Sequence, residues 1–172
     1  MDQFLAEIQG RAFRMAQIAT GSSDDALDLV QDAMFKLVEK YSDRPEQQWR
    51  PLFYRILQSR INDWYRRNQV RNRHRIFLNS HNEDGEDPIQ TAKDESHHTP
   101  EAEFQAEQGM QELQLALEKL PLRQQQAFLL RAWEGLNVKQ TAQAMSCAEG
   151  SVKTHYSRAI HSLREQLSEH WP

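Results

Sequence analysis

The hydrophobic residues at the start of the chain recur at the spacing of an amphipathic helix. Through residues 1–20 a large apolar side chain returns about once per turn, which predicts one helix with a single buried face. Gly21 interrupts the pattern, and either Ser22 or Ser23 can cap the helix that follows. Asp24 falls in the first turn of that helix, where the helix dipole favours acids. The first apolar face consists of Phe4, Ile8, Phe13, Met15 and Ile18.

Two more helices are predicted before residue 70. The first runs from residue 24 to about Tyr41 and is followed by a turn at residues 43–45. Its apolar stripe is expected to consist of Leu27, Val30, Met34, Leu37 and Val38. The second spans roughly residues 48–68, and its buried side is expected to consist of Leu52, Ile56, Leu57, Ile61 and Trp64.

The composition changes between residues 78 and 100, where acidic and turn-forming residues replace apolar ones. Because this segment has almost nothing to bury, it is expected to be a flexible acidic linker. Thr99 and Pro100 suit the cap and the first position of another helix. The buried face of that helix is expected to hold Met110, Leu113, Leu117 and Leu120. A further helix is predicted to begin at Pro121, with packing residues Ala127, Phe128, Leu130 and Ala132.

The segment 135–158 has the sequence features of a helix-turn-helix. Asn137 can cap a short helix, and Gln140 three residues later can return the hydrogen bond. Ser146 and Glu149 repeat this capping-box pattern nine residues further along. A short helix, a tight turn and a longer helix match the plan of this DNA-binding motif. Ala142 is small where the two crossing helices must approach closely, and the core between them is expected to consist of Leu136, Val138, Met145, Val152, Ile160 and Leu163.

The second helix of this motif carries hydroxyls and cations in its N-terminal half, the half that enters the major groove of DNA. Its cations suit phosphates, and its hydroxyls and imidazole suit base edges. A plain helical hairpin with a polar surface is the alternative, which the two consecutive capping boxes disfavour. No metal site is expected, because His155 and His161 are six residues apart and lack partners. The candidate DNA-binding residues are Ser151, Lys153, Thr154, His155, Ser157 and Arg158.

The distribution of charge points to nucleic acid although the whole chain has a net charge of −4. Residues 44–75 contain nine arginines and two acids, a local charge of +7. Residues 76–109 contain nine acids and one lysine, a local charge of −8. Within residues 61–75 the arginines alternate with aromatic and amide side chains, a combination that suits unstacked bases and phosphates. Trp64 has two interpretations, because its spacing from Ile61 suits the core as well as a stacking role.

Other features bear on compartment and chemistry. The chain has no apolar run of about 18 residues, so membrane insertion is not expected. The first ten residues lack the pattern of a secretory signal. Cys147 is the only cysteine, which excludes an internal disulfide and favours the cytoplasm. No cofactor is expected, and the absence of a phosphate loop, a metal cluster or a nucleophile–base set argues against an enzyme.

Taken together, four segments resemble the extracytoplasmic-function class of bacterial RNA polymerase sigma factors. Residues 25–32 resemble the helix with which that family docks on the largest polymerase subunit. Residues 49–67 resemble the segment that melts and recognises the −10 promoter element. Residues 120–128, followed by 150–159, resemble the domain that recognises the −35 element.

The resemblance implies roles for individual residues. The implied polymerase-binding residues are Asp25, Asp28, Gln31 and Asp32. The residues expected to bind the −10 element are Asn62, Trp64, Arg66, Arg67, Asn68, Gln69, Arg71 and Arg73. The six candidates in 151–158 are assigned to the −35 element. The sequence departs from the family at Leu27, where an acid is usual, and at Ser59 and Arg60, where an asparagine is usual.

The expected protein is therefore all-α, with two small helical domains joined by a flexible acidic linker. The predicted boundaries are 1–77 for polymerase docking and −10 recognition, 78–100 for the linker, and 101–172 for the helix-turn-helix domain. The expected function is that of an alternative sigma factor that directs promoter-specific initiation of transcription. Its expected partners are core RNA polymerase, promoter DNA and an anti-sigma factor. The alternative is an autonomous helix-turn-helix regulator, but no sustained heptad pattern supports the dimer it would need.

Overall fold

The computed structural model describes the backbone of residues 1–79 and 102–167, and the side chains of residues 1–71 and 109–167. Within these ranges the chain is helical and contains no strand, which confirms the all-α class. The predicted linker lies outside the described residues from position 80 onward, as do Thr99 and Pro100. The elements are α1 (Asp2–Thr20), α2 (Ser23–Tyr41), α3 (Glu46–Asn79), α4 (Ala102–Glu118), α5 (Leu122–Phe128), η1 (Leu129–Trp133), α6 (Val138–Met145) and α7 (Glu149–Gln166).

The connection between α1 and α2 is a two-residue turn that suits its sequence. Gly21 ends α1 with a positive φ of 68°, a conformation that costs glycine little. Ser22 is the cap of α2, and its Oγ accepts a hydrogen bond from the backbone N–H of Asp25 at 3.2 Å. Of the two serines predicted as candidates, Ser22 is therefore the cap and Ser23 is the first helical residue.

The buried face of α2 differs from the predicted stripe. Val30 and Leu37 are buried as expected, but Leu27 is 48% exposed and Val38 is 42% exposed. The face that packs inward also includes Ala26, Leu29 and Ala33. Small alanines let neighbouring helices approach closely, so the packed face is rotated by about one residue from the one predicted by side-chain size alone. The prediction was wrong for Leu27 and Val38, which leaves two apolar side chains on the outside of the helix.

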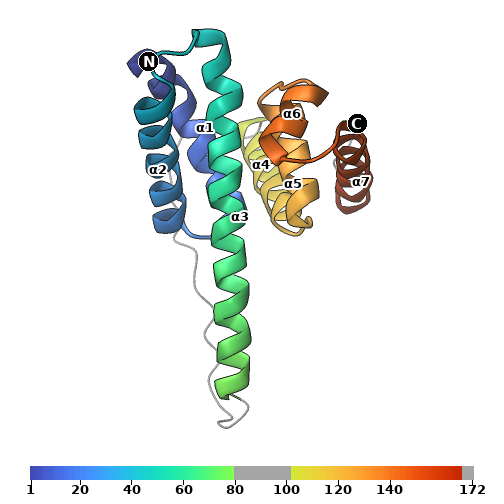
Figure 1. Ribbon diagram of the computed structural model, residues 1–172. Helices are drawn as coiled ribbons and strands as arrows, with labels where there is room; N and C mark the ends of the chain where they lie inside the picture. The colour runs from blue at the N-terminus through green and yellow to red at the C-terminus, as the bar shows by residue number, and fades with distance from the viewer. Residues whose placement is uncertain (80–101, 168–172) are drawn as a thin grey trace.

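Helix α3 does not end at Asn68 as predicted but continues to Asn79. No glycine or proline lies between these two residues, so the backbone has no reason to break despite the crowded arginines. Ile61 is buried as expected, whereas Trp64 is half-buried and meets the ring of Tyr65 edge-on at 5.7 Å. Figure 1 shows the C-terminal half of α3 extending well beyond the rest of the molecule.

In the first helices of the C-terminal half, two residues that were predicted to be packed are exposed. Met110 is exposed, whereas Leu117 is buried, because the last turns of α4 are the ones that pack into the core. Ala132 is exposed as well. It lies in η1, a single π-helical segment whose extra residue per turn shifts the buried face onto Leu129 and Leu130.

The helix-turn-helix is present, with one of its two predicted capping boxes. The Asn137 side chain accepts a hydrogen bond from the backbone of Gln140 at 2.8 Å, and Gln140 Oε1 accepts one from the backbone of Asn137 at 3.0 Å. Ser146 does not cap α7. It ends α6 in the left-handed conformation, with φ 52°, and Ala148 precedes α7 without a side-chain cap. The tight turn needs a residue of positive φ at this position, and that conformation excludes the extended backbone of an N-cap.

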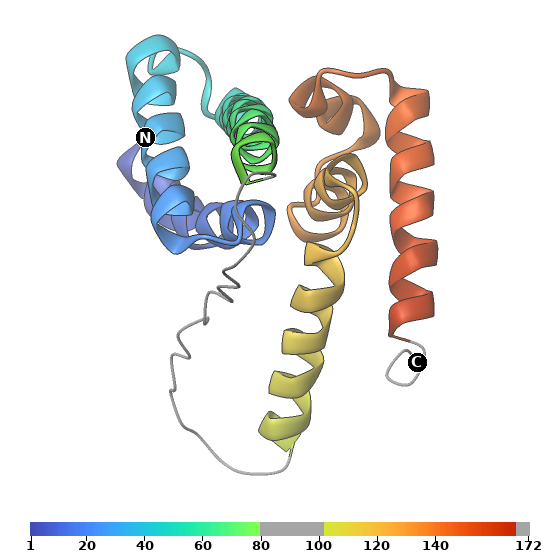
Figure 2. The same cartoon turned by 90° about the horizontal axis from the view of Figure 1, so that it is seen from below.

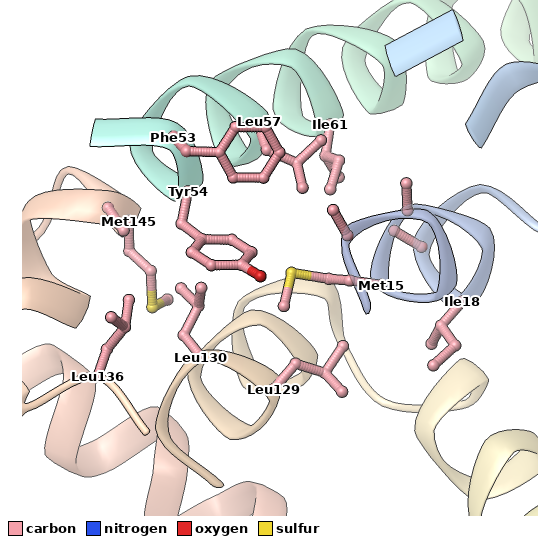
Figure 3. Close-up of a cluster of buried hydrophobic side chains, with 14 of the residues drawn as sticks. Met15, Ile18, Phe53, Tyr54, Leu57, Ile61, Leu129, Leu130, Leu136 and Met145 are labelled. Atoms are coloured by element: carbon pink, nitrogen blue, oxygen red, sulfur yellow. The ribbon is translucent and has the colours of Figure 1, made fainter. Parts of the chain in front are cut away.

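The described helices form two groups that pack against each other through α3. Helices α1 and α2 cover one side of α3, and α5 and α6 lie against another side, with α7 beyond them (Figures 1 and 2). The buried side chains of both groups form one hydrophobic cluster. Figure 3 shows the ring of Tyr54 pointing from α3 into the space between Met15 of the N-terminal group and Leu130 of the C-terminal group.

Candidate nucleic-acid and polymerase interfaces

The predicted polymerase-binding residues lie together on the outer face of α2. Asp28, Gln31 and Asp32 are exposed, while Asp25 is half-buried beside the helix cap. Asp32 also forms an ion pair with Arg60 of α3, with 2.7 Å between Oδ2 and Nε. This contact links the predicted docking face to one of the positions that depart from the family pattern.

Three exposed apolar residues share this face, although none of them was predicted to belong to it. They are Leu27 and Val38, which were wrongly predicted to be buried, and Phe35, which is 73% exposed. We call the set Leu27, Asp28, Gln31, Asp32, Phe35 and Val38 the α2 outer surface. A large exposed aromatic ringed by polar residues is typical of a protein interaction site. Phe35 could have been found from the sequence only by assigning the buried face of α2 correctly.

The residues predicted to bind the −10 element do not share one face of α3. At 100° per residue, Asn62, Arg66 and Gln69 fall on one side of the helix, together with position 73. The opposite side carries Trp64, Arg67, Asn68 and Arg71. The two sets are therefore about a helix diameter apart, roughly 10 Å, and cannot contact the same few atoms of DNA. The side chain of Arg73 lies outside those that the structure describes.

The side of α3 that carries Asn62 faces the C-terminal half. Asn62 Oδ1 accepts a hydrogen bond from Gln126 Nε2 of α5 at 3.0 Å. Next to this contact is a groove of about 640 Å³ between α3 and the turn of the helix-turn-helix. Arg66 lines the groove and is paired with Asp63 at 2.8 Å. The residues lining it are Ser59, Asn62, Tyr65, Arg66, Gln69, Leu122, Arg123, Ala144, Met145 and Ser146.

The six candidates on α7 lie on its outer side, which Figure 2 shows facing away from α3. The side chains of Lys153, Thr154 and Arg158 are exposed, as is that of Ser157, while those of Ser151 and His155 are half-buried. The opposite side of α7 packs into the core through Val152, Ala159 and Leu163. This arrangement presents the polar residues as one surface that a DNA groove can reach.

Three residues outside that set support the α7 surface. Arg123 of α5 donates a hydrogen bond to the carbonyl of Met145 at 2.8 Å and so fastens the end of α6. The guanidinium of Arg131 lies 5.6 Å from the ring centre of Tyr156, a cation–π distance. Burial, together with the nearby Arg123 and Arg158, lowers the pKa of His155. Arg123 of α5 and Arg131 of η1 therefore add positive charge beside the α7 surface from outside the recognition helix.

The described residues carry neither a metal centre nor a membrane span. No group of three or more metal-ligating side chains gathers anywhere in these ranges. Among the same residues, no helix is both long enough and apolar enough to cross a membrane.

Comparison with known proteins assigns both halves of the chain. Residues 1–71 match the family model described as Sigma-70 region 2, and residues 110–163 match Sigma-70, region 4. The chain is 27% identical to the ECF RNA polymerase sigma factor SigE of Mycolicibacterium smegmatis over 177 aligned positions. That alignment covers 98% of this chain and 62% of the relative, so the chain spans less than two thirds of that protein's length.

Two solved structures share the fold. One is the sigma factor RpoE of Bartonella quintana, crystallised with the anti-sigma factor NepR. It is 25% identical, with a TM-score of 0.65, and the match covers 99% of this chain and all of that one. The other is a complex of the anti-anti-sigma factor PhyR with NepR from the same organism, with 18% identity and a TM-score of 0.52. It covers 96% of this chain and 50% of that one and shows the fold alone. With both sigma regions matched in order along one helical chain, this protein belongs to the sigma-70 family, in its extracytoplasmic-function class.

Proposed function

We propose that this protein is an alternative sigma factor, which binds core RNA polymerase and directs initiation at a specific set of promoters. The observation that carries the proposal is the presence of region 2 and region 4 in one chain, each with an uncovered polar surface. In this proposal residues 1–77 dock on polymerase and bind the −10 element, residues 78–100 connect, and residues 101–172 bind the −35 element. The protein acts by binding, so no residue is assigned a covalent step.

The α2 outer surface is the proposed docking site for polymerase. Phe35 at its centre is the apolar anchor, and Asp28 and Asp32 at its rim set the charge of the partner. When a partner binds, an exposed aromatic ring loses its contact with water and supplies binding energy, while the charged residues around it orient the partner. We therefore expect a partner surface with an apolar pocket and basic residues around it.

The two sides of α3 are proposed to have different tasks at the −10 element. The side with Trp64 and Arg71 carries an aromatic ring and cations that suit unstacked bases and their phosphates. Each stacked base contributes about 1–3 kcal/mol toward strand opening. The side with Asn62 and Arg66 then contacts the other flank of the opened region.

The outer side of α7 is the proposed −35 site. Lys153 and Arg158 are placed for phosphates, which give affinity without sequence selectivity. Thr154 and Ser151, with His155, are placed for base edges. Because the pKa of His155 is lowered, its neutral imidazole, which can both donate and accept a hydrogen bond, is favoured near pH 7.

Two further points follow from the same proposal. The similar RpoE was crystallised with an anti-sigma factor, so we propose that a protein of that kind also regulates this chain. Since polymerase and promoter DNA are inside the cell, we place the protein in the cytoplasm.

Run-off transcription with core polymerase and a promoter library tests the proposal. We expect the protein to confer selectivity on core polymerase for a subset of promoters that share two elements. An autonomous regulator instead binds a palindrome by itself. If the protein alone protects a palindrome with high affinity and core polymerase gains no selectivity, the proposal is wrong.

A sharper test concerns the arginines of α3. The double variant Arg71→Ala with Arg73→Ala is expected to lose strand opening, detected with permanganate, while it keeps its affinity for core polymerase. The matched control, Lys40→Ala with Lys119→Ala, removes the same charge from two exposed positions outside α3 and α7. Unchanged opening in the arginine variant, or equal loss in the control, contradicts the −10 assignment.

A further inference from the structure

The groove between α3 and the turn of the helix-turn-helix is lined by residues from both halves of the chain. Its volume of about 640 Å³ is within the range of ligand-binding sites. Helix α3 supplies one wall, which includes Asn62, Tyr65 and Arg66, and the C-terminal half supplies the other, which includes Arg123 and Ser146. No acidic side chain belongs to this lining in the part of the chain that the structure describes. The groove is therefore positively charged and suits an anion.

The wall formed by α3 is open to solvent. The side chain of Arg66 is 76% exposed, Gln69 is exposed, and Asn62 and Tyr65 are half-buried. Asn62 Oδ1 accepts a hydrogen bond from Gln126, which leaves the amide nitrogen of Asn62 as a donor. A ligand can therefore reach this wall while the two halves of the chain are packed as they are in Figure 2.

The side chains of the groove are of the three kinds that proteins use to hold single-stranded nucleic acid. The guanidinium of Arg66 suits a phosphate, and the ring of Tyr65 suits stacking against a base. The amides of Asn62 and Gln69 have donors and acceptors for the edge of an unpaired base. A simple inorganic anion would use only the cations, so the aromatic ring and the amides favour a nucleotide ligand.

Arg123 is held in place on the opposite wall. Its Nη1 donates a hydrogen bond to the carbonyl of Met145 at 2.8 Å and lies 3.4 Å from Oε1 of Gln126. A guanidinium has several N–H donors, so the remaining ones are available to a phosphate. Because this side chain is already ordered, binding a phosphate costs less conformational entropy here than at a free lysine. The site is therefore composite, and its cation on the C-terminal side depends on how the two halves pack.

The groove continues across α3 into a smaller hollow. Ser59 lines both, and the hollow, of about 160 Å³, lies between α2 and α3 with Lys36 and Arg55 in its lining. That volume equals the share of about five water molecules, which accommodates one base or one phosphate and not a base pair. Arg60 also lines the hollow and is paired with Asp32. Cations therefore follow a path from α2 over Ser59 to the helix-turn-helix, which suits a single strand better than a lone nucleotide.

We propose that the free chain binds one single strand of nucleic acid across α3, in a composite site that joins α3 to Arg123 of the C-terminal half. This inference goes beyond the proposed function, because the site requires neither polymerase nor a promoter. The proposed −10 contact uses Asn62 and Arg66 in the polymerase complex, and this site adds a residue of the other half. DNA and RNA share the phosphates and the unpaired base edges, so the ligand class is a single-stranded polynucleotide.

Fluorescence anisotropy of the full chain without polymerase tests the inference. The probes are labelled DNA and RNA strands of about 12 nucleotides, within the usual span of single-strand sites, and the same DNA as a duplex. Arg66→Ala removes one phosphate contact and is expected to lower the slope of log K against log salt concentration by about 0.7 for the single strands. Arg44→Ala is the matched control, because Arg44 is an exposed arginine outside both hollows. An equal slope in the two variants overturns the site.

The ring of Tyr65 provides a second measurement. Tyr65→Ala is expected to weaken single-strand binding at least about fivefold, whereas Tyr65→Phe keeps the stacking ring and most of the affinity. Lys153→Ala, on the α7 surface, is expected to weaken binding of the duplex and to leave binding of the single strand unchanged. Equal affinity of the two Tyr65 variants for the strand overturns the stacking role. A mononucleotide that binds as tightly as the strand overturns the path across α3.

A photochemical cross-link shows whether the C-terminal half takes part. A strand that carries a photoactivatable thio-base is expected to cross-link both to α3 and to the segment 122–146 in the absence of polymerase. Cross-links confined to α3 overturn the composite site. These readouts are separate from those of the proposed function. If core polymerase gains no promoter selectivity while the strand still cross-links to both segments, the proposed function is wrong and the single-strand site stands.

Discussion

Replacing Phe35 with alanine separates docking from folding more cleanly than any other single change. Phe35 is 73% exposed, so its loss is expected to change the free energy of unfolding by no more than about 0.5 kcal/mol. A buried aromatic side chain covers about 150–250 Å². Roughly 110–180 Å² of Phe35 is therefore free to be buried on docking, about 3–4.5 kcal/mol at ~25 cal/mol per Å². Alanine keeps part of that area, so the expected loss in binding is about 2 kcal/mol, a roughly thirtyfold increase in Kd for core polymerase.

The assay is fluorescence titration of labelled protein with core polymerase, with thermal unfolding of the free protein as a companion measurement. Leu115→Ala is the matched control, because Leu115 is a 56% exposed apolar residue on α4, away from the α2 outer surface. We expect unchanged unfolding for both variants and weaker binding for Phe35→Ala alone. Wild-type affinity of the Phe35 variant refutes the assignment of this surface, and equal weakening by both variants shows a general effect of apolar area.

Three other predictions concern the helix-turn-helix. Leu163→Ala removes a fully buried side chain from α7 and is expected to lower the free energy of unfolding by about 2–5 kcal/mol, measured by urea denaturation. Asn137→Ala removes the capping box of α6 and is expected to cost about 1 kcal/mol, whereas Asn137→Asp retains most of the stability; equal loss in both contradicts the capping role. The folded-state pKa of His155 lies below its ordinary value of 6.5, so the unfolded chain takes up a proton more readily and stability falls as the pH drops below about 6.5. His155→Gln is expected to make the urea midpoint of unfolding depend less on pH below about 6.5. An unchanged pH dependence of the midpoint would show that His155 is not its cause.

The sequence by itself determined the helices and the family of this protein. Helical spacing, the cap at Ser22 and the capping box at Asn137 depend on neighbouring residues, so they are visible without the tertiary structure. The same local logic failed at Ser146. There the turn between α6 and α7 needs a residue with a positive φ. The spacing of Ser146 and Glu149 is the same whether the serine ends α6 or begins α7, so the local pattern does not distinguish the two roles.

Tertiary structure decided which faces are covered. Leu27, Val38 and Phe35 are on the outside of α2 because alanines set the packing face, and side-chain hydropathy alone does not encode how closely two helices approach. The predicted −10 residues were grouped by their position along α3, yet helical geometry places them on two opposite sides. The pairing of Asn62 with Gln126 and of Arg50 with Glu134 joins residues 64 and 84 positions apart. Such contacts depend on how the two halves pack, and no local pattern in the sequence specifies them.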